Sequence, residues 1–70
     1  MRADERDGAA GSSVRERRRA RSLTQQDLAD AVGVSRQTVI SMETGDYAPS
    51  VYLALRIARA LDSSVEALWG

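Results

Sequence analysis

The segment "GVSRQTVISME", Gly33 to Glu43, carries side chains suited to specific recognition. Arg36 and Gln37 stand side by side at what reads as the start of a helix, and Thr38 follows them. An arginine fork and a glutamine amide each present paired hydrogen-bonding groups in a fixed geometry. The chemistry that this segment indicates is therefore recognition of a polar partner.

Catalytic chemistry has no comparable support. The chain of 70 residues contains no cysteine and no histidine, which removes disulfides, thiolate nucleophiles, the usual zinc ligands and the commonest general base. No constellation of acid, base and nucleophile is visible in the remaining residues. We expect no enzyme, no cofactor and no metal site.

Length and hydropathy narrow the class of protein. A chain of this size makes one small domain. It has no apolar run approaching the ~20 residues that span a bilayer, and its first residues, "MRADERDGAAGSS", lack the apolar core of a signal peptide. We expect a soluble, cytoplasmic protein without a membrane partner.

Charge alone does not identify a partner. Ten basic residues balance ten acidic ones, and five of the ten arginines fall between Arg15 and Arg21. From Val14 to Thr44 there are six arginines against four acidic residues, a surplus of two. That local surplus is too small to decide for or against nucleic acid.

Helix-start signals divide the chain. Residues 1–12 are small and charged without an apolar period, which predicts a disordered tail before a domain at 13–70. Ser13 and Glu16 have capping-box spacing, which predicts that Ser13 caps a first helix running to about Arg21.

The next two helices lie on either side of a sharp turn. Thr24 is placed to cap a helix over 25–32, and Ser35 to cap one over 36–44. Gly33 between them suits the left-handed conformation that ends a helix and turns the chain. We expect these two helices to share one core while they cross steeply.

Two further helices complete the chain. Gly45 and Pro49 interrupt the pattern before Ser50 opens the fourth helix, and a final short helix begins after either Ser63 or Ser64. Apolar residues line one face of the fourth helix at spacings of three and four. They are Leu53, Ala54, Ile57, Ala58 and Leu61. Five helices without a strand signal predict an all-α domain.

The steep crossing leaves the start of the third helix protruding. A protruding helix start can enter the major groove of DNA, where arginine pairs bidentately with guanine and glutamine with adenine. Arg36 and Gln37 occupy this position.

The chain resembles the Cro and phage-repressor type of helix-turn-helix regulators, also called XRE-like. The resemblance runs from Val14 to Trp69 through the segments "LTQ", "GVSRQT" and "PS…LRIARAL" in order. It implies a five-helix, lambda-repressor-like fold with the helix-turn-helix at helices 2 and 3. It also implies binding to double-stranded operator DNA.

The resemblance assigns roles to individual residues. Arg36, Gln37 and Ser41 match base-facing positions. Gln25 matches a residue that binds a phosphate and braces the recognition helix, and Thr38 lies near the DNA backbone. Each also has an alternative reading as solvated surface, which for the short hydroxyl of Ser41 weighs equally.

Arg18 and Arg17 of the first helix have different expected roles. Arg18 and Glu43 match a structural ion pair that joins helix 1 to the end of helix 3. From the arginine run we expect one or two phosphate contacts, with Arg17 the foremost candidate, because the run cannot face one duplex as a whole. The others are read as a solvated face.

Four residues depart from the family pattern, and the first is Arg17, which stands where many relatives have leucine and thins the core beneath helix 1. Asp46 stands where relatives often carry a cation facing phosphates, so its charge should weaken binding. Ile40 is apolar at a usually polar position and could meet a thymine methyl or a protein neighbour. Asp62 replaces the usual glycine after helix 4, and aspartate tolerates the left-handed region better than most residues.

Two functions remain at this stage. The first is a sequence-specific DNA-binding regulator that acts as a homodimer, with Tyr52, Leu55 and Trp69 as candidate dimer contacts; Trp69 has the alternative role of capping the core. The second is an antitoxin-like or adaptor module that uses an apolar patch around Ile40, Tyr52 or Trp69 to hold a protein partner. Salt dependence separates the two, because only DNA binding should weaken steeply with salt.

Overall fold

The computed structural model describes residues 13–70, which form helices joined by short loops. Residues 13–20 are helical, and four further helices follow. These are α2 (Gln25–Val32), α3 (Arg36–Thr44), α4 (Val51–Ala60) and α5 (Val65–Trp69). No strand occurs in residues 13–70, and the prediction of an all-α, five-helix domain is confirmed.

Side-chain caps start three of the helices where the sequence predicts them. The Thr24 hydroxyl accepts a hydrogen bond from the backbone N–H of Asp27 at 2.9 Å, and the Asp27 carboxylate accepts one from the N–H of Thr24 at 2.9 Å. Ser35 and Ser50 cap α3 and α4 through their hydroxyls in the same way. Each cap supplies an acceptor to an N–H group that has no partner inside the helix.

The structure also shows how the first helix and the last helix begin. Ser13 is itself helical, so the prediction that it caps the first helix is wrong. Capping-box spacing does not distinguish a cap from two helical residues that share a face. The final helix is capped by Ser64 and not by Ser63, because the Ser64 hydroxyl accepts from the N–H of Ala67 at 3.1 Å. The predicted tail at 1–12 lies outside the described residues.

A tight turn at Gly33 joins α2 to α3. Gly33 has φ 79° and ψ 36°, and its N–H donates to the carbonyl of Ala29 at 2.9 Å. The N–H of Val34 reaches the same carbonyl at 3.0 Å. This left-handed termination lets α3 begin only three residues after α2 ends.

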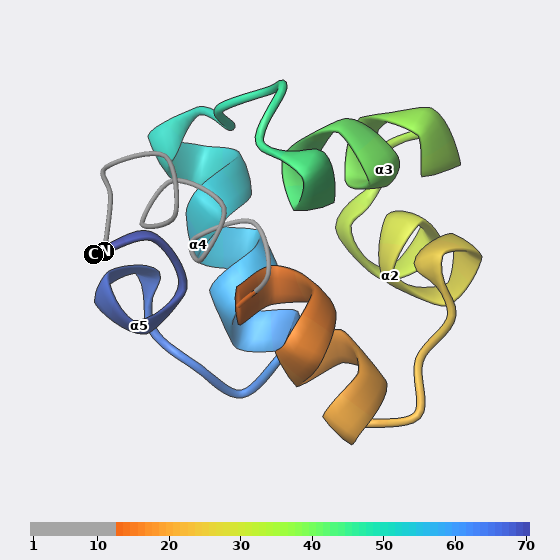
Figure 1. Ribbon diagram of the computed structural model, residues 1–70, viewed down its shortest axis with the longest axis horizontal. Helices are drawn as coiled ribbons and strands as arrows, with labels where there is room; N and C mark the ends of the chain where they lie inside the picture. Colours follow the sequence, from red (N-terminus) through yellow and green to blue (C-terminus); the bar gives the residue numbers. More distant parts are fainter. Residues whose placement is uncertain (1–12) are drawn as a thin grey trace.

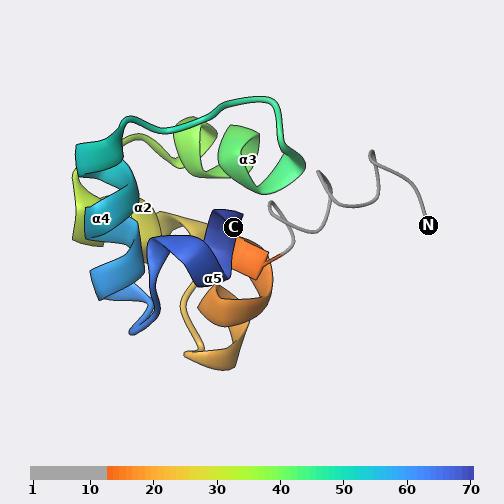
Figure 2. The ribbon, with the colours of Figure 1, turned by 90° about the vertical axis from the view of Figure 1, so that its left-hand side faces the viewer.

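A single apolar core holds the helices together. Its members come from all five helical segments and are buried. They are Val14, Leu28, Ala29, Val32, Val39, Met42, Leu53, Ile57, Ala58, Leu61 and Leu68. α2 packs against both α3 and α4, and α4 packs against α5. α3 therefore lies along one edge of the molecule, the upper edge in both views (Figures 1 and 2).

Candidate nucleic-acid interface

The two faces of α3 differ in how far their side chains are buried. The inner face buries Val39, Met42 and Glu43. The outer face carries residues that are exposed or half-buried: Arg36, Gln37, Ile40, Ser41 and Thr44. The three residues expected to read bases thus share one face, and Ile40 lies among them.

Arg36 and Gln37 have unused hydrogen-bonding groups. Within residues 13–70, neither side chain takes part in a hydrogen bond or an ion pair. Both are exposed, and both lie in the first turn of α3. Two polar side chains next to one another without internal partners are available to an external ligand.

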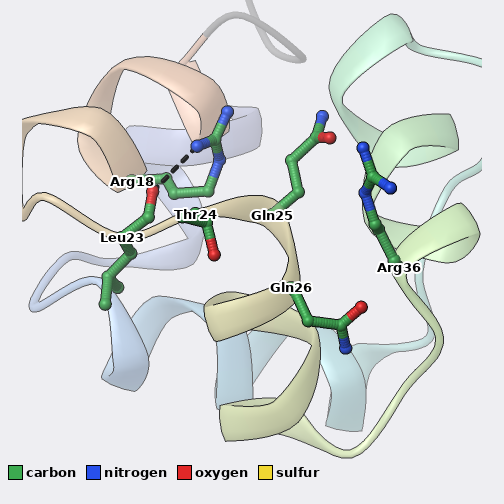
Figure 3. A pocket seen from close by; sticks show the side chains of 6 residues that line it. All are labelled: Arg18, Leu23, Thr24, Gln25, Gln26 and Arg36. Atoms are coloured by element: carbon green, nitrogen blue, oxygen red, sulfur yellow. Dashed lines mark hydrogen bonds between the residues drawn. The ribbon is translucent and has the colours of Figure 1, made fainter.

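The start of α2 lies beside Arg36 and forms a hollow with it. The hollow has a volume of about 440 Å³. It is lined by Arg18, Leu23, Thr24, Gln25, Gln26 and Arg36 (Figure 3). Three helical segments therefore contribute to one concave surface: residues 13–20, α2 and α3.

Arg18, which lines this hollow, belongs to a buried ion pair. Arg18 donates from Nε to Glu43 Oε2 at 2.6 Å and from Nη2 to Glu43 Oε1 at 3.1 Å. Its Nη1 donates to the carbonyl oxygen of Leu23 at 2.8 Å, the bond drawn in Figure 3. The pair expected between Arg18 and Glu43 is therefore present, and it neutralises the Arg18 charge. Arg36 is left as the unpaired cation of the hollow.

Gln25 is tied to the same ion pair. Its Nε2 donates to Glu43 Oε1 at 3.1 Å, so this carboxylate oxygen accepts from both Gln25 and Arg18. Gln25 is half-buried, and its side chain reaches the hollow. The resemblance implied that Gln25 braces the recognition helix, but Glu43 as its partner was not predicted, because residues 18 positions apart in the chain leave no periodic signal for a mutual contact.

The capping box of α2 stabilises a charged group close to the hollow. The backbone hydrogen bond from Thr24, followed by the one with its side chain, holds the pKa of Asp27 below its ordinary value of 3.8. Asp27 therefore stays ionised at neutral pH. Its charge lies in the first turn of a helix, where the helix dipole favours an anion.

Thr38 lies at the junction of the turn and α3. Its hydroxyl shares a hydrogen bond of 2.9 Å with the hydroxyl of Ser35, while its backbone N–H bonds to the Ser35 hydroxyl at 3.1 Å. Thr38 is half-buried. The structure therefore fixes this hydroxyl at the start of α3, on the rim of the outer face.

Arg17 does not lie with the residues that line the hollow. Its Nη2 donates to the carbonyl oxygen of Asp62 at 2.8 Å, in the loop between α4 and α5. Asp62 has φ 53°, in the left-handed region that the sequence analysis expected it to tolerate. Arg17 is exposed, and it connects the first helix to this loop and does not line the hollow.

Asp46 is fixed near the far end of α3. The Thr44 hydroxyl donates to its carboxylate at 3.1 Å, and the Asp46 N–H donates to the carbonyl of Ser41 at 2.9 Å. Gly45 between them has φ 87°. The structure therefore holds a negative charge beside Thr44, at the end of the outer face.

A second surface lies on α4 and α5 and is apolar. Tyr47, Val51, Tyr52 and Leu55 are the exposed large hydrophobic residues of the described part of the chain, and Tyr52 is 79% exposed. Beside them is a hollow of about 280 Å³. It is lined by Ala48, Pro49, Val51, Ala54, Val65 and Trp69.

Trp69 has the core-packing role that the sequence offered as its alternative, and its role as a dimer contact stays a prediction. It is half-buried and packs against the core, and it also lines the second hollow. We define the apolar surface as Val51, Tyr52, Leu55, Val65 and Trp69. Val51 was missed by the sequence analysis, although its place off the inward face of α4 could have identified it.

Residues 13–70 contain neither a candidate metal site nor a candidate membrane-spanning helix. Within them, no group of three or more acidic, histidine or cysteine side chains could hold a metal ion. No helix of this part of the chain is long and apolar enough to cross a membrane.

Comparison with known proteins identifies the family. A model of the family described as helix-turn-helix matches residues 14–68. The chain belongs to the helix-turn-helix family, in its Cro and phage-repressor type. It is a transcriptional regulator with a helix-turn-helix DNA-binding domain, and this family consists of regulators and not of enzymes.

Relatives of this helix-turn-helix protein include proteins of similar length. An uncharacterized HTH-type transcriptional regulator of Methanothermobacter thermautotrophicus is 58% identical over 48 residues, covering 69% of this chain and 70% of the relative. The uncharacterized HTH-type transcriptional regulator YgzD of Bacillus subtilis is 44% identical over 55 residues, covering 79% and 83%.

Solved structures share the fold. The restriction-modification controller protein C.AhdI from Aeromonas hydrophila superposes with a TM-score of 0.81 at 34% identity, over 89% of this chain and 94% of that one. The clp gene regulator ClgR from Corynebacterium glutamicum also gives 0.81, at 28% identity, over 90% and 67%. The lambda-repressor-like fold expected from the sequence is therefore shown.

Proposed function

We propose that this helix-turn-helix protein binds operator DNA in a sequence-specific manner, with α3 in the major groove and two copies bound as a homodimer. The observation that carries the proposal is the pair of exposed side chains, Arg36 and Gln37, in the first turn of α3. Neither has a partner within residues 13–70.

Base reading follows from the chemistry of the outer face. The Arg36 guanidinium can donate two parallel hydrogen bonds to O6 and N7 of guanine, and the Gln37 amide can pair with N6 and N7 of adenine. Ser41 lies one turn further along the same face and contributes less, because a hydroxyl discriminates bases weakly. Ile40 offers an apolar contact to a thymine methyl.

Phosphate contacts set the register of α3 on the duplex. Gln25 has a second N–H on Nε2 that Glu43 does not use, and Thr38 has its hydroxyl on the rim of the outer face. The first-turn N–H groups of α2 favour an anion at the same place. We leave Arg17 out of this set, because its guanidinium is bonded to the carbonyl of Asp62.

The apolar surface supports the homodimer. Tyr52 and Leu55 are exposed on α4, and Trp69 of α5 lines a hollow together with Val51 and Ala54 of α4. No member of this surface is itself charged, so two copies could meet there through an apolar contact. A dimer would place two copies of α3 about 34 Å apart, one turn of DNA. The compartment we propose is the cytoplasm, where a bacterial-type regulator meets its DNA.

Selection from a random duplex pool tests the proposal. Bound duplexes are recovered and sequenced over several rounds, and we expect an inverted repeat whose half-sites are one helical turn apart. The logarithm of the association constant for the selected duplex should fall linearly with the logarithm of salt concentration. A pool that shows no enrichment would contradict operator-specific binding.

The apolar surface also supports a second function, an antitoxin-like or adaptor module that holds a protein partner. In that case the same residues would meet another protein, and binding would depend little on salt. Failure to enrich any duplex, together with a salt-insensitive protein complex lost in Tyr52→Asp, would favour this second function.

A further inference from the structure

Ile40 is a half-buried hydrophobic residue whose position the core does not explain. It lies on the outer face of α3, and it neither belongs to the core nor packs against it. The other half-buried hydrophobic residues of 13–70 all pack against the core: Leu23, Val34, Ala60, Val65 and Trp69. The packing of the domain therefore gives no reason for an isoleucine at position 40.

Helix stability does not explain Ile40 either. Isoleucine has a lower helix propensity than glutamine, glutamate, lysine or arginine, because its branched Cβ restricts χ1 against the preceding turn. The neighbouring Val39 is branched as well, but it is fully buried and belongs to the core. At position 40 a straight polar side chain would stabilise the helix more. A stiff apolar side chain there suits a contact outside the domain, since it loses little rotamer freedom when that contact forms.

Ile40 lies beside the residues proposed to read bases. It follows Arg36 by four positions and Gln37 by three, which are the two spacings at which side chains meet on a helix surface. Arg36 and Gln37 have no partner within residues 13–70. A base contact by either polar side chain therefore brings Ile40 to the same base pair or to an adjacent one.

The major groove offers one kind of apolar group to such a side chain. All four bases present hydrogen-bond donors or acceptors there, and thymine adds a methyl group on C5. Cytosine that is methylated on C5 presents its methyl group at the same place. Isoleucine has neither donor nor acceptor, so it cannot distinguish O4 of thymine from N4 of 5-methylcytosine by a hydrogen bond.

We infer that Ile40 is a specificity-determining residue that reads the C5-methyl group of a pyrimidine, and that methylation of cytosine at the base it faces therefore strengthens DNA binding. The inference rests on the proposed function and deepens it, because the ligand of Ile40 becomes a methyl group that either pyrimidine can carry. Operator binding then responds to a chemical modification of DNA as well as to its sequence.

The test removes or adds single methyl groups in one half-site of the selected operator. Each thymine is replaced in turn by deoxyuridine, which lacks only the methyl group. At the position where this change weakens binding most, the thymine is also replaced by cytosine and by 5-methylcytosine, each paired with guanine. Kd is measured for each duplex by fluorescence anisotropy. The ratio of two Kd values from one protein sample does not depend on its folded fraction.

Three variants are compared with the wild type. Ile40→Ala removes the side chain beyond Cβ, whereas Ile40→Val keeps the branched Cβ and loses one carbon. Arg56→Ala is the control, because Arg56 is exposed on α4 and no contact with DNA is proposed for it. Circular dichroism should show the same helix content in all of them, since neither position packs against the core.

The expected result is a methyl preference that depends on Ile40. The wild type should prefer thymine over deoxyuridine, and 5-methylcytosine over cytosine, by about fourfold each, which is the gain from burying one methyl-sized group. Arg56→Ala should keep both ratios, and Ile40→Val should keep both at about twofold or more. Ile40→Ala should bring both ratios to about one, because alanine does not reach the methyl group. With both half-sites of the homodimer changed, the wild-type ratios should rise to about 16-fold, because the two contacts add in free energy.

Other results separate the failures. If selection yields an operator but no single methyl group changes its affinity, or if the ratios survive Ile40→Ala, the methyl-reading role is overturned and the proposed function stands. If thymine is preferred over deoxyuridine while 5-methylcytosine and cytosine bind equally, the response to cytosine methylation is overturned. If no duplex is enriched, operator binding fails and the methyl-reading role fails with it.

Discussion

The guanidinium of Arg18 and the carboxylate of Glu43 form a bidentate ion pair that joins the first helix to the last turn of α3. The two bonds measure 2.6 and 3.1 Å, and both residues are buried. The pair is thus part of the core that supports the recognition helix. Its disruption should affect folding before it affects binding.

Removing one member of this pair should be strongly destabilising. Arg18→Ala or Glu43→Ala leaves a buried charge without its partner, and we expect the free energy of unfolding to fall by about 3–5 kcal/mol. Urea denaturation followed by circular dichroism measures the change. The control is Arg19→Ala, because the neighbouring Arg19 is exposed and should change stability by no more than ~0.5 kcal/mol. A loss below about 1 kcal/mol at Glu43 would mean that water solvates the unpaired Arg18.

Arg36→Ala should weaken operator binding by roughly 1–3 kcal/mol and relax the preference at one base pair. Arg36→Ala should weaken binding to random duplex less, because a random sequence only occasionally presents the base that Arg36 contacts. Competition titrations with operator and random duplex measure both. Arg56→Ala on the outer face of α4 is the control and should change neither affinity. Equal losses on the two duplexes would assign Arg36 to a phosphate.

Asp46→Lys should strengthen DNA binding without changing its sequence preference. The substitution removes a fixed negative charge beside Thr44 and adds a cation that can meet a phosphate. We expect the slope of log K against log salt to become steeper by about 0.9 for each bound copy, and so by about 1.8 for the proposed homodimer. Asp46→Asn removes only the charge and should give a smaller gain. A reduced affinity for the operator alone would instead show that Asp46 accepts a hydrogen bond from a base.

Tyr52→Asp and Leu55→Asp should shift the homodimer toward monomer. Each places a charge on the apolar surface, where the twofold arrangement would bring it close to its own copy. Analytical ultracentrifugation measures the dissociation constant of the dimer, and Ala20→Asp on the exposed face of the first helix is the control. If the wild-type protein sediments as a monomer at every concentration, with or without operator, the dimer proposal is contradicted.

The capping box of α2 should make stability depend on pH in the acid range. The pKa of Asp27 is lower in the folded protein than its ordinary value of 3.8, because of its hydrogen bonds with Thr24. A lowered pKa means that Asp27 contributes stability at pH values above 3.8, which is lost as pH falls through the folded pKa. The urea midpoints of wild type and Asp27→Asn should therefore differ at pH 6 and converge as the pH falls through the folded pKa of Asp27. A difference that stays constant across this range would exclude the charge as its cause.

Local signals predicted the helices that form the binding site. Thr24, Ser35 and the glycine at 33 are each read from a few neighbouring residues, and they place α2 and α3 at 25–32 and 36–44, as observed. Ser13 was misassigned because its spacing to Glu16 also fits two residues inside one helix. The residue that caps α5 could not be chosen from the sequence, since both Ser63 and Ser64 have suitable neighbours.

Contacts between distant residues were harder to predict. The resemblance to a family supplied the partner of Arg18, and no local pattern would have done so. The bonds from Gln25 to Glu43 and from Arg17 to Asp62 join residues 18 and 45 positions apart. They depend on how the helices pack, and packing is not encoded in the period of any one helix. The roles of Arg36, Gln37 and Ser41 toward DNA stay predictions.

The ion pair of Arg18 and Glu43 limits how this domain can be engineered. The segment proposed to read DNA is short, and we expect that exchanging residues 36, 37, 40 and 41 with those of a relative would redirect specificity. Position 43 belongs to the same helix but must remain glutamate for as long as position 18 is arginine. A helix-turn-helix fragment cut out at residues 24–45 would carry that carboxylate without its guanidinium, so the portable unit begins with the first helix.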